Sequence, residues 1–402
     1  MSNLSTHLEG SPVLSYDSHD ESVSETTESN RDGGNRKQVS PSKLLNTLNS
    51  TSFETDLSAP RSNRHEDRSN TYASDPKYQK YVQLVGRNLQ SFDYVQEWAD
   101  VIAFLTKLSR SFEIYTKFAV VPHKVTVTKR LAQCLNPALP TGVHQKTLSI
   151  YELIFNQIGS EELVMDLSLY ALGLFPFMRN ASLAAKPQLL GILEDFFVPL
   201  GPGLRPCLKS ITVGVLPGLE EGSADVVHRV VGLLDKLRDT IDEPFFFQTL
   251  FLIMITNSEQ RESALKYLAQ RLPVFTRQED VAQVCGDDAS LMARALAATL
   301  TDPKTLVLRA ALDLVMTRFP LRTTVFRRKD LVLLMKHASE VVLKKDMSLN
   351  RRLYTWLLGP GDSEAEQAAY FGQFAQSPLT DALLGSFAAM SSAPDHQHTV
   401  LR

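Results

Sequence analysis

Cysteine is scarce in this sequence, and its spacing excludes two kinds of small stabilised domain. The 402 residues contain only three cysteines, Cys134, Cys207 and Cys285, which lie far apart in the chain. This spacing supports neither a disulfide framework nor a Cys-x-x-Cys metal site. We therefore expect the chain to occupy a reducing compartment.

Long hydrophobic runs and targeting signals are also missing. The longest apolar stretch, residues 245–255, contains Gln248 and Thr249 and is far shorter than the roughly 20 residues that span a bilayer. The stretch Met1–Gly10 lacks the basic and apolar regions of a secretory signal, and Ser2 stands where N-myristoylation requires glycine. The sequence thus predicts a cytoplasmic protein.

The motifs of common cofactor and metal sites are absent from the sequence. It contains no Gly-x-Gly-x-x-Gly, no Gly-x-x-x-x-Gly-Lys-Ser/Thr, no His-Glu-x-x-His and no EF-hand loop. The segment Gly201-Pro202-Gly203 is rich in glycine, but no lysine follows it, and we interpret it as a turn between helices. We expect no cofactor, no metal ion and no enzyme activity.

A few polar residues are candidates for chemistry, yet each group has a simpler structural interpretation. A Cys-His nucleophile pair would join Cys134 to His123 or His144, but no orienting group or oxyanion element accompanies these residues. His396 and His398 supply only two of the about four ligands that a closed metal site needs. Two pairs of adjacent acids are expected to serve solvation and helix capping: Asp287-Asp288 and Glu220-Glu221.

Both ends of the chain are predicted to be disordered. Residues 1–75 are dominated by Ser, Thr, Asn and charged residues, and their only aromatic residues are Tyr16, Phe53 and Tyr72. So little apolar area cannot offset the roughly 1 to 2 kcal/mol that ordering each backbone residue costs. We predict a disordered segment at 1–75 and a second one at 391–402.

From Pro76 onward the hydrophobic pattern is helical. Apolar residues recur at spacings of three and four, as on one face of an α-helix, in three clear runs: Trp98, Val101, Ile102, Leu105 and Leu108; Leu163, Leu167, Tyr170, Ala171 and Leu174; and Leu308, Ala311, Leu312, Val315 and Phe319. Helix-start residues agree with this pattern at Ser160, Thr276 and Ser363. No stretch shows the sustained alternation of apolar and polar residues that is typical of β-strands, so the sequence predicts an all-α fold.

The helices are expected to form repeats. Helical pairs open near Gly142, Ala184 and Ala224, at intervals close to the roughly 40 to 47 residues of HEAT or armadillo repeats. Such pairs stack into an α-solenoid, because one pair cannot bury its apolar face alone. We predict a HEAT/armadillo-like α-solenoid over residues 76–360, with additional helices over 361–390. A compact helical bundle is the competing architecture.

Positive charge is concentrated in one segment. The net charge of the chain is only -3, which argues against a protein that coats nucleic acid. Between Thr301 and Arg352, however, twelve Lys or Arg residues stand against five acids. Basic residues near an anionic membrane contribute about 1 kcal/mol each. The candidates for contact with anionic lipid are Arg327, Arg328, Lys329, Lys336, Lys344 and Lys345. Solvated faces of core helices are the competing interpretation.

Several blocks of the sequence resemble the amino-terminal region of the Dopey family. The first is Lys129-Arg-Leu-Ala-Gln-Cys-Leu-Asn-Pro-Ala-Leu-Pro-Thr-Gly-Val-His144. The others are Tyr151-Glu152, Leu172-Gly-Leu-Phe-Pro176, Pro199-Leu-Gly201, Val215-Leu-Pro-Gly-Leu-Glu-Glu-Gly222 and Ser348-Leu-Asn-Arg-Arg-Leu-Tyr-Thr-Trp-Leu-Leu-Gly359. The resemblance covers residues 77–360. Members of this family are usually much longer than 402 residues.

The resemblance implies a non-enzymatic scaffold of helical repeats that acts peripherally on membranes of the Golgi, the trans-Golgi network and endosomes. It implies a large partner related to Arf guanine-nucleotide exchange factors, and it suggests kinesin-1 light chain and phosphatidylinositol 4-phosphate as further partners. No catalytic residue is implied, and we expect no nucleic acid partner. The alternative is a cytosolic module that links cargo or kinesin without touching lipid.

Overall fold

Helices make up almost the whole described part of the chain. The computed structural model describes residues 71–392, so most of the segments predicted to be disordered, and both His396 and His398, lie outside the described residues. Within residues 71–392 there is no strand, and β-type pairing is limited to one isolated bridge between Arg277 and Thr324. The all-α prediction is confirmed.

The α-helices and the short 3₁₀ or π segments between them follow one another in a regular series. The α-helices are α3 (Pro76–Ser91), α4 (Trp98–Ile114), α5 (Lys124–Cys134), α6 (Thr141–Met165), α7 (Leu167–Leu174), α8 (Lys186–Ile192), α9 (Leu208–Val215), α10 (Ala224–Ile241), α11 (Glu243–Thr256), α12 (Arg261–Arg271), α13 (Gln278–Cys285), α14 (Ala289–Leu300), α15 (Thr305–Arg318), α16 (Arg328–Glu340), α17 (Met347–Leu358), α18 (Glu364–Tyr370) and α19 (Gln376–Ser392). The short segments are η2 (Phe92–Tyr94), η3 (Phe175–Arg179), η4 (Leu193–Phe197), η5 (Val198–Cys207), η6 (Leu216–Glu220), η7 (Ser258–Gln260), η8 (Val341–Lys344) and η9 (Phe371–Ala375).

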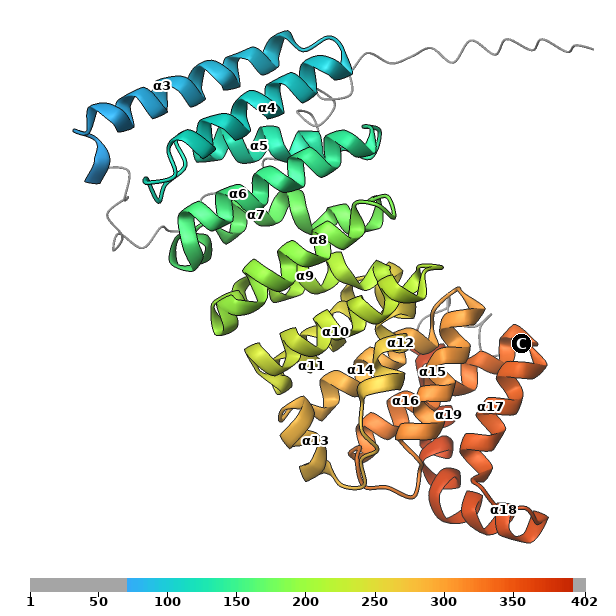
Figure 1. The fold of residues 1–402 in the computed structure, drawn as a ribbon. Coiled ribbons are helices and arrows are strands. Elements are labelled where there is room, and N and C mark those ends of the chain that lie inside the picture. Colours follow the sequence, from blue (N-terminus) through green and yellow to red (C-terminus); the bar gives the residue numbers. More distant parts are fainter. Residues whose placement is uncertain (1–70, 393–402) are drawn as a thin grey trace, which may run out of the picture. The chain divides into compact units, whose positions relative to one another are not determined.

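The helices stack in two layers (Figure 1). One layer contains α4, α6, α8, α10, α12, α15 and α17, and the other contains α5, α7, α9, α11, α14, α16 and α19. Neighbours within a layer touch directly, except that η3 joins α7 to α9 and η6 joins α10 to α12. The chain thus alternates between the layers, which is the arrangement of an α-solenoid and not of a compact bundle.

The predicted repeat starts match helix starts. The helical pairs expected near Gly142, Ala184 and Ala224 begin with α6 at Thr141, α8 at Lys186 and α10 at Ala224. These three helices are successive members of the same layer. The repeat interval seen in the sequence is therefore the interval between neighbours in a layer.

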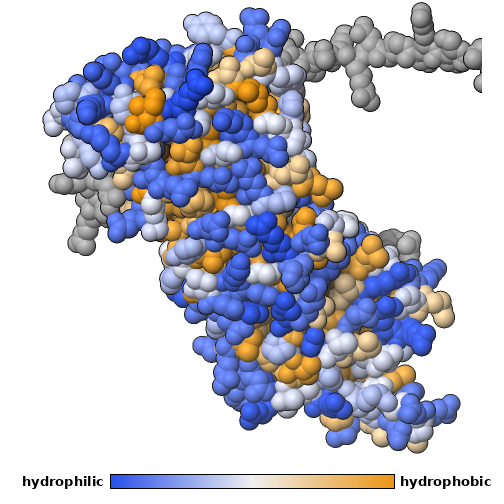
Figure 2. Space-filling view, viewed as in Figure 1, coloured by the Kyte–Doolittle hydropathy of each residue, from blue (hydrophilic) through white to orange (hydrophobic). Residues whose placement is uncertain are grey.

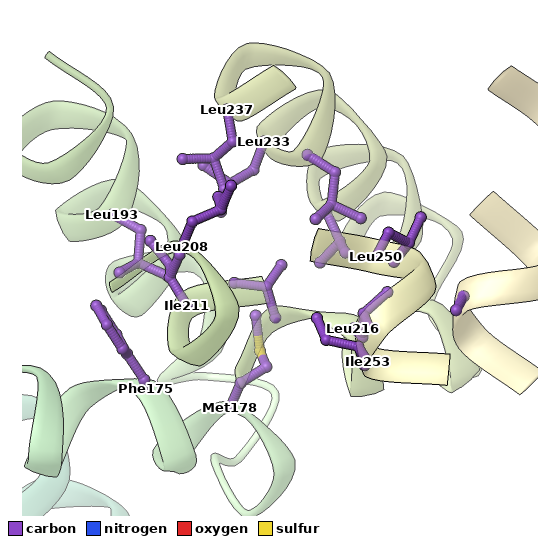
Figure 3. Close-up of a cluster of buried hydrophobic side chains, with 14 of the residues drawn as sticks. Phe175, Met178, Leu193, Leu208, Ile211, Leu216, Leu233, Leu237, Leu250 and Ile253 are labelled. Carbon is purple, nitrogen blue, oxygen red and sulfur yellow. The ribbon is translucent and has the colours of Figure 1, made fainter. Parts of the chain in front are cut away.

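Apolar side chains from both layers form one continuous core. Figure 3 shows part of it, where residues from η3, α9, α10 and α11 meet, among them Phe175, Ile211, Leu237 and Leu250. All four side chains are buried. On the outside, Figure 2 shows mostly hydrophilic side chains with smaller apolar groups between them.

Charged side chains connect each repeat to the next at a nearly constant sequence separation. Examples of ion pairs that join neighbours within a layer are Lys124–Asp166, Lys186–Glu221, Arg229–Glu194, Arg261–Asp302, Arg309–Asp346 and Arg352–Asp313. Their partners lie 35 to 42 residues apart in the sequence. This separation equals about one repeat, so the pairs fix how adjacent helices of a layer align.

Two local predictions in the middle of the chain were wrong. The apolar run from Leu163 to Leu174 was expected to be one helix, but α6 ends at Met165 and α7 starts at Leu167. The junction is Asp166, whose carboxylate accepts two hydrogen bonds of 2.9 Å from Lys124 of the preceding repeat. Ile102, expected in the core, is 36% exposed on α4.

Two helix ends also differ from prediction. The start expected at Thr276 lies one residue later, because the N-cap of α13 is Arg277, whose backbone N–H donates to Asp280 at 3.0 Å. The tail predicted to be disordered from residue 391 begins too early, since α19 continues to Ser392. The first helix breaker beyond Ala388 and Ala389 is Pro394, so nothing in the sequence ends the helix sooner. At Ser363 the predicted capping box with Glu366 is present.

The ion pair between Arg261 and Asp302 should matter more for stability than an exposed pair. Asp302 is 2% exposed and Arg261 13% exposed, at 2.8 Å. We expect Arg261→Ala to lower the free energy of unfolding by about 3 to 5 kcal/mol, because it leaves a buried carboxylate without its partner. The matched control is Arg179→Ala, which breaks the exposed pair with Glu259 and should cost less than about 1 kcal/mol. Urea unfolding measures the free energy of unfolding of both variants. Equal losses of stability would contradict the larger role assigned to the Arg261–Asp302 pair.

The close contact between α9 and η3 requires glycine at position 214. A Cβ atom there would lie 2.3 Å from the carbonyl oxygen of Phe175, whereas a Cβ at Gly232 would meet nothing within 4 Å. We expect Gly214→Ala to destabilise the chain by about 1 to 3 kcal/mol through overpacking. Gly232→Ala, in the middle of α10, should stabilise it by up to about 1 kcal/mol through helix propensity. Thermal unfolding of the two variants checks the opposite signs.

Candidate functional site

The six basic residues predicted to contact lipid do not gather at one place. Residues 327–329 lie at the start of α16, Lys336 lies within it and is half-buried, and Lys344 and Lys345 lie beyond its end. The 13 residues of α16 separate the two clusters by about 20 Å, at 1.5 Å per residue. The six residues therefore form two separate clusters at the two ends of α16 and not one patch.

One residue of the cluster at the start of α16, Arg328, has a structural role. The Arg328 guanidinium donates to the carboxylate of Asp381 and to the hydroxyl of Ser377, both at 2.6 Å. These contacts attach α16 to α19, its neighbour in the same layer. Arg327 is the N-cap of α16, and both Arg327 and Lys329 are exposed. The charge of Arg328 is therefore already partnered within the fold.

The turn after α16 combines exposed apolar side chains with lysines. We call residues 342–347, between α16 and α17, the 342–347 tip. Three large apolar side chains in it are exposed to solvent by 36%, 40% and 82%: Val342, Leu343 and Met347. Lys344 and Lys345 stand between them and are also exposed. Lys345 adopts the left-handed backbone conformation, with φ of 55°, where the chain turns towards α17.

The single acid of the 342–347 tip is neutralised by the fold. Asp346 caps α17 by accepting the backbone N–H groups of Ser348 at 2.8 Å and Leu349 at 3.1 Å. Its second oxygen accepts a hydrogen bond of 2.9 Å from Arg309. The backbone N–H of Leu349 and the Arg309 guanidinium lower the pKa of this carboxyl. The two lysines thus determine the charge that the tip presents.

The ion pair to Asp346 also brings an exposed apolar residue of α15 to this edge. Arg309 belongs to α15, and α15 packs beside α17 with the two N-termini on the same side, as the second pair from Arg352 to Asp313 shows. Leu306, one turn before Arg309, is 61% exposed. The exposed apolar residues here, among them Val342 and Leu343 of η8, were not identified from the sequence.

The candidate Cys-His pair is not assembled. Cys134 is fully buried at the end of α5, and burial raises the pKa of its thiol to about 12. The His144 ring is buried and its Nε2 lies 2.8 Å from the carbonyl oxygen of Asn136, while His123 is exposed at the N-cap of α5. Among the described residues, no hydrogen bond joins Cys134 to either histidine.

Three of the four paired acids have structural partners among the described residues. Asp288 caps α14 by accepting the backbone N–H of Leu291 at 3.0 Å, as expected of a capping acid. Glu221 instead forms an ion pair with Lys186, and Glu220 accepts a hydrogen bond from the Ser263 hydroxyl, so both connect neighbouring repeats. The Gly201 turn is present, with φ of 55°.

Residues 71–392 contain neither a metal-binding cluster nor a membrane-spanning helix. No group of three or more His, Cys, Asp or Glu side chains in this part of the chain is arranged to hold a metal ion. None of its helices combines the length and the apolar character that crossing a bilayer requires.

Comparison with known proteins identifies the family. The family model described as "Dopey, N-terminal" matches residues 75–362, which include both layers of the array and the 342–347 tip. The chain belongs to the Dopey family. The match ends close to the start of α18, so the Dopey region comprises the helices from α3 to α17. No solved structure matches the chain.

Curated relatives from animals and fungi support the same assignment. Protein DOP1 homolog of Drosophila pseudoobscura pseudoobscura is 38% identical over 286 residues, which are 71% of this Dopey chain and 11% of the relative. Protein DOP1B of Mus musculus is 35% identical over 332 residues, covering 77% and 14%. Protein DOP1 of Saccharomyces cerevisiae is 31% identical over 343 residues, covering 73% and 20%. The chain thus spans at most about a fifth of the length of these relatives.

The burial of the cysteines predicts their reactivity. Cys134 and Cys285 are buried, and burial raises the pKa of all three thiols, Cys207 included. At pH 8 we therefore expect iodoacetamide to label Cys207 first, more slowly than free cysteine, and to leave Cys134 and Cys285 unmodified until the chain is unfolded. Mass spectrometry before and after addition of guanidinium measures this order. Labelling of native Cys134 faster than free cysteine would restore the nucleophile hypothesis.

Proposed function

We propose that this Dopey chain is a non-enzymatic scaffold in membrane traffic between endosomes and the Golgi. Its helical array presents surfaces to protein partners, and its 342–347 tip contacts anionic lipid. Family membership supports the traffic role. The observation that carries the lipid contact is the tip itself, where exposed Leu343 and Met347 flank two lysines and the single acid is paired with Arg309.

The tip suits a membrane interface better than bulk water. Apolar side chains gain about 25 cal/mol for each Å² that they remove from water, and each lysine near an anionic leaflet adds about 1 kcal/mol. Two lysines and a few apolar side chains give only a weak, reversible contact with the membrane. Stable peripheral binding usually takes two separate membrane-directed contacts. We therefore include in the proposal a second contact, made through a protein partner at the membrane.

The partners proposed are those of the family resemblance. They are a large partner related to Arf exchange factors, kinesin-1 light chain, and membranes that contain phosphatidylinositol 4-phosphate. The proposed location is the cytoplasmic face of Golgi, trans-Golgi network and endosome membranes. Of the lipid-contact residues predicted from the sequence, Lys344 and Lys345 are retained as the primary contacts.

Vesicle flotation tests the lipid contact. The chain is floated with phosphatidylcholine vesicles with and without phosphatidylinositol 4-phosphate. We expect a tip variant, Lys344→Glu with Lys345→Glu, to reduce the bound fraction on the anionic vesicles several-fold. Binding by the native chain should also weaken as salt rises, since exposed charges are screened within about 8 Å at physiological ionic strength.

The matched control reverses the same number of charges at the other end of α16. Arg327→Glu with Lys329→Glu keeps Arg328 and its contact with Asp381 intact. This control should float like the native chain. If the tip variant and the native chain float equally well on anionic vesicles, the tip is not the contact; if the control loses binding instead, the contact lies at residues 327–329.

A second candidate function is a cytosolic module that binds proteins without touching lipid. The observation that favours it is a pocket of about 400 Å³ between η3, α9 and η7, remote in sequence from the tip. Under this alternative, partners are recovered from membrane-free cytosol at full yield and the native chain does not float with anionic vesicles.

A further inference from the structure

An apolar groove lies along the edge where the second layer passes from α7 to α9 and α11. Its walls come from residues of η3, α9 and the segments beside them, and it has a volume of about 400 Å³. The apolar lining residues are Ala171, Leu172, Phe175, Pro176, Val213 and Pro217. This volume is within the about 300 to 1,000 Å³ of typical ligand pockets. We call it the η3–η7 groove.

Two features shape the walls of the groove. Because Gly214 has no side chain, the backbone of Phe175 lies directly against it, and this contact brings η3 and α9 together as one wall. Leu172 of α7 also lines the groove and is 47% exposed, although most residues of this helix are buried. An apolar side chain that entered the groove would cover Leu172, and the apolar surfaces of both side chains would then be removed from water.

The polar end of the groove contains an unsatisfied acceptor. Gln260, the N-cap of α12, is only 5% exposed, and its Oε1 has no hydrogen-bond partner among the described residues. Gln260 lines the groove and also the smaller pocket of about 230 Å³ that adjoins it. Because buried acceptors are nearly always satisfied in native proteins, this amide is suited to receive an N–H donor from a bound molecule, after a small rotation of its side chain.

The adjoining pocket is acidic. Glu220, Glu221 and Glu259 line it, and Arg179 is its single basic lining residue. The ion pair between Arg179 and Glu259 lies at the boundary of the two pockets, and both side chains are about 60% exposed. The Arg179 guanidinium lowers the pKa of Glu259, so that carboxyl is ionised at neutral pH. Glu221 is paired with Lys186 and Glu259 with Arg179, whereas Glu220 accepts a hydrogen bond from Ser263 and has no ion pair within the described residues. The groove therefore leads from apolar walls to a region whose net negative charge comes from Glu220.

We propose that the η3–η7 groove binds a peptide segment of a protein partner in which an apolar side chain is followed closely by arginine or lysine. The apolar side chain occupies the space between Leu172 and Val213, and the basic side chain donates to Gln260 and lies among the acids of the adjoining pocket. An anionic lipid does not fit, because the same acids repel it. This inference rests on the proposed role as a protein-binding scaffold and specifies the partner's chemistry.

Peptide selection tests the proposal even while the partner is unidentified. A random peptide library displayed on phage is selected on the full chain, and one enriched peptide is synthesised with a fluorescent label. We expect a consensus of an apolar residue followed within a few positions by Arg or Lys. An acidic consensus, or no enrichment, would overturn the proposal.

Leu172→Asp and Leu252→Asp form a matched pair for locating the peptide. Both leucines are partly exposed, at 47% and 41%, but only Leu172 lines the groove. Fluorescence anisotropy of the labelled peptide should show at least tenfold weaker binding to the Leu172 variant and unchanged binding to the Leu252 variant. Equal affinity for both variants would place the peptide elsewhere.

Gln260→Leu separates binding from folding. The substitution keeps the size of the side chain and removes the unsatisfied oxygen, so the melting temperature should stay the same or rise. Peptide affinity should nevertheless fall about fivefold or more. A lower melting temperature with unchanged peptide affinity would show that Gln260 has only a structural role and would overturn its part in the site.

The chain's own head is the principal competitor for the groove, because Lys43-Leu44-Leu45 offers the same two kinds of side chain in the reverse order. If the variant Leu44→Ser with Leu45→Ser binds the labelled peptide several-fold more tightly than the native chain, the head and not a partner occupies the groove. Unchanged affinity supports a partner peptide. Vesicle flotation through the 342–347 tip is independent of these outcomes, so failure of the groove and failure of the scaffold proposal are distinguishable.

Discussion

The ion pairs between successive repeats are the interaction on which the array depends. Hydrophobic burial is non-directional, so it specifies the alignment of neighbouring helices less sharply than a charged pair does. A pair such as Arg352–Asp313 forms only when α17 and α15 are aligned to within about one turn. Because the most buried pair, Arg261–Asp302, cannot be broken cheaply, it fixes that alignment in the centre of the chain.

Alignment of the repeats decides what each edge of the array presents. The loops that lead from the second layer to the first all lie on one edge, and they carry both the η3–η7 groove and the 342–347 tip. The two regions have opposite character: Glu220 gives the pocket beside the groove a net negative charge, whereas Lys344 and Lys345 make the tip basic. A net charge of -3 conceals this division, because the two signs are segregated along the chain and nearly cancel in the total.

The spacing of apolar residues and helix caps along the sequence was enough to predict the helices and their pairing. Features that depend on contacts between different repeats were not predicted. The run from Leu308 to Phe319 and the capping box at Ser363 were predicted correctly, since each depends on residues a few positions apart. The break at Asp166 depends on Lys124, 42 residues away, and no local rule identifies that partner. The groove was missed for the same reason: Leu172, Gly214 and Gln260 come from three successive repeats and meet only after stacking. The two lysines of the tip were identified from the sequence. That they lie far from residues 327–329 follows only from the structure, where α16 stands between the two clusters.

The position of Asp346 has a mechanical consequence. This one side chain holds the start of α17, accepts a hydrogen bond from Arg309 of α15, and belongs to the turn that carries the exposed lysines. A pull on the tip is therefore shared between two helices of the same layer and does not unravel a free loop. Further pairs of this kind pass the tension on towards the centre of the layer. An array joined in this way is expected to yield by whole repeats, so a chain under load would lengthen in steps and not gradually.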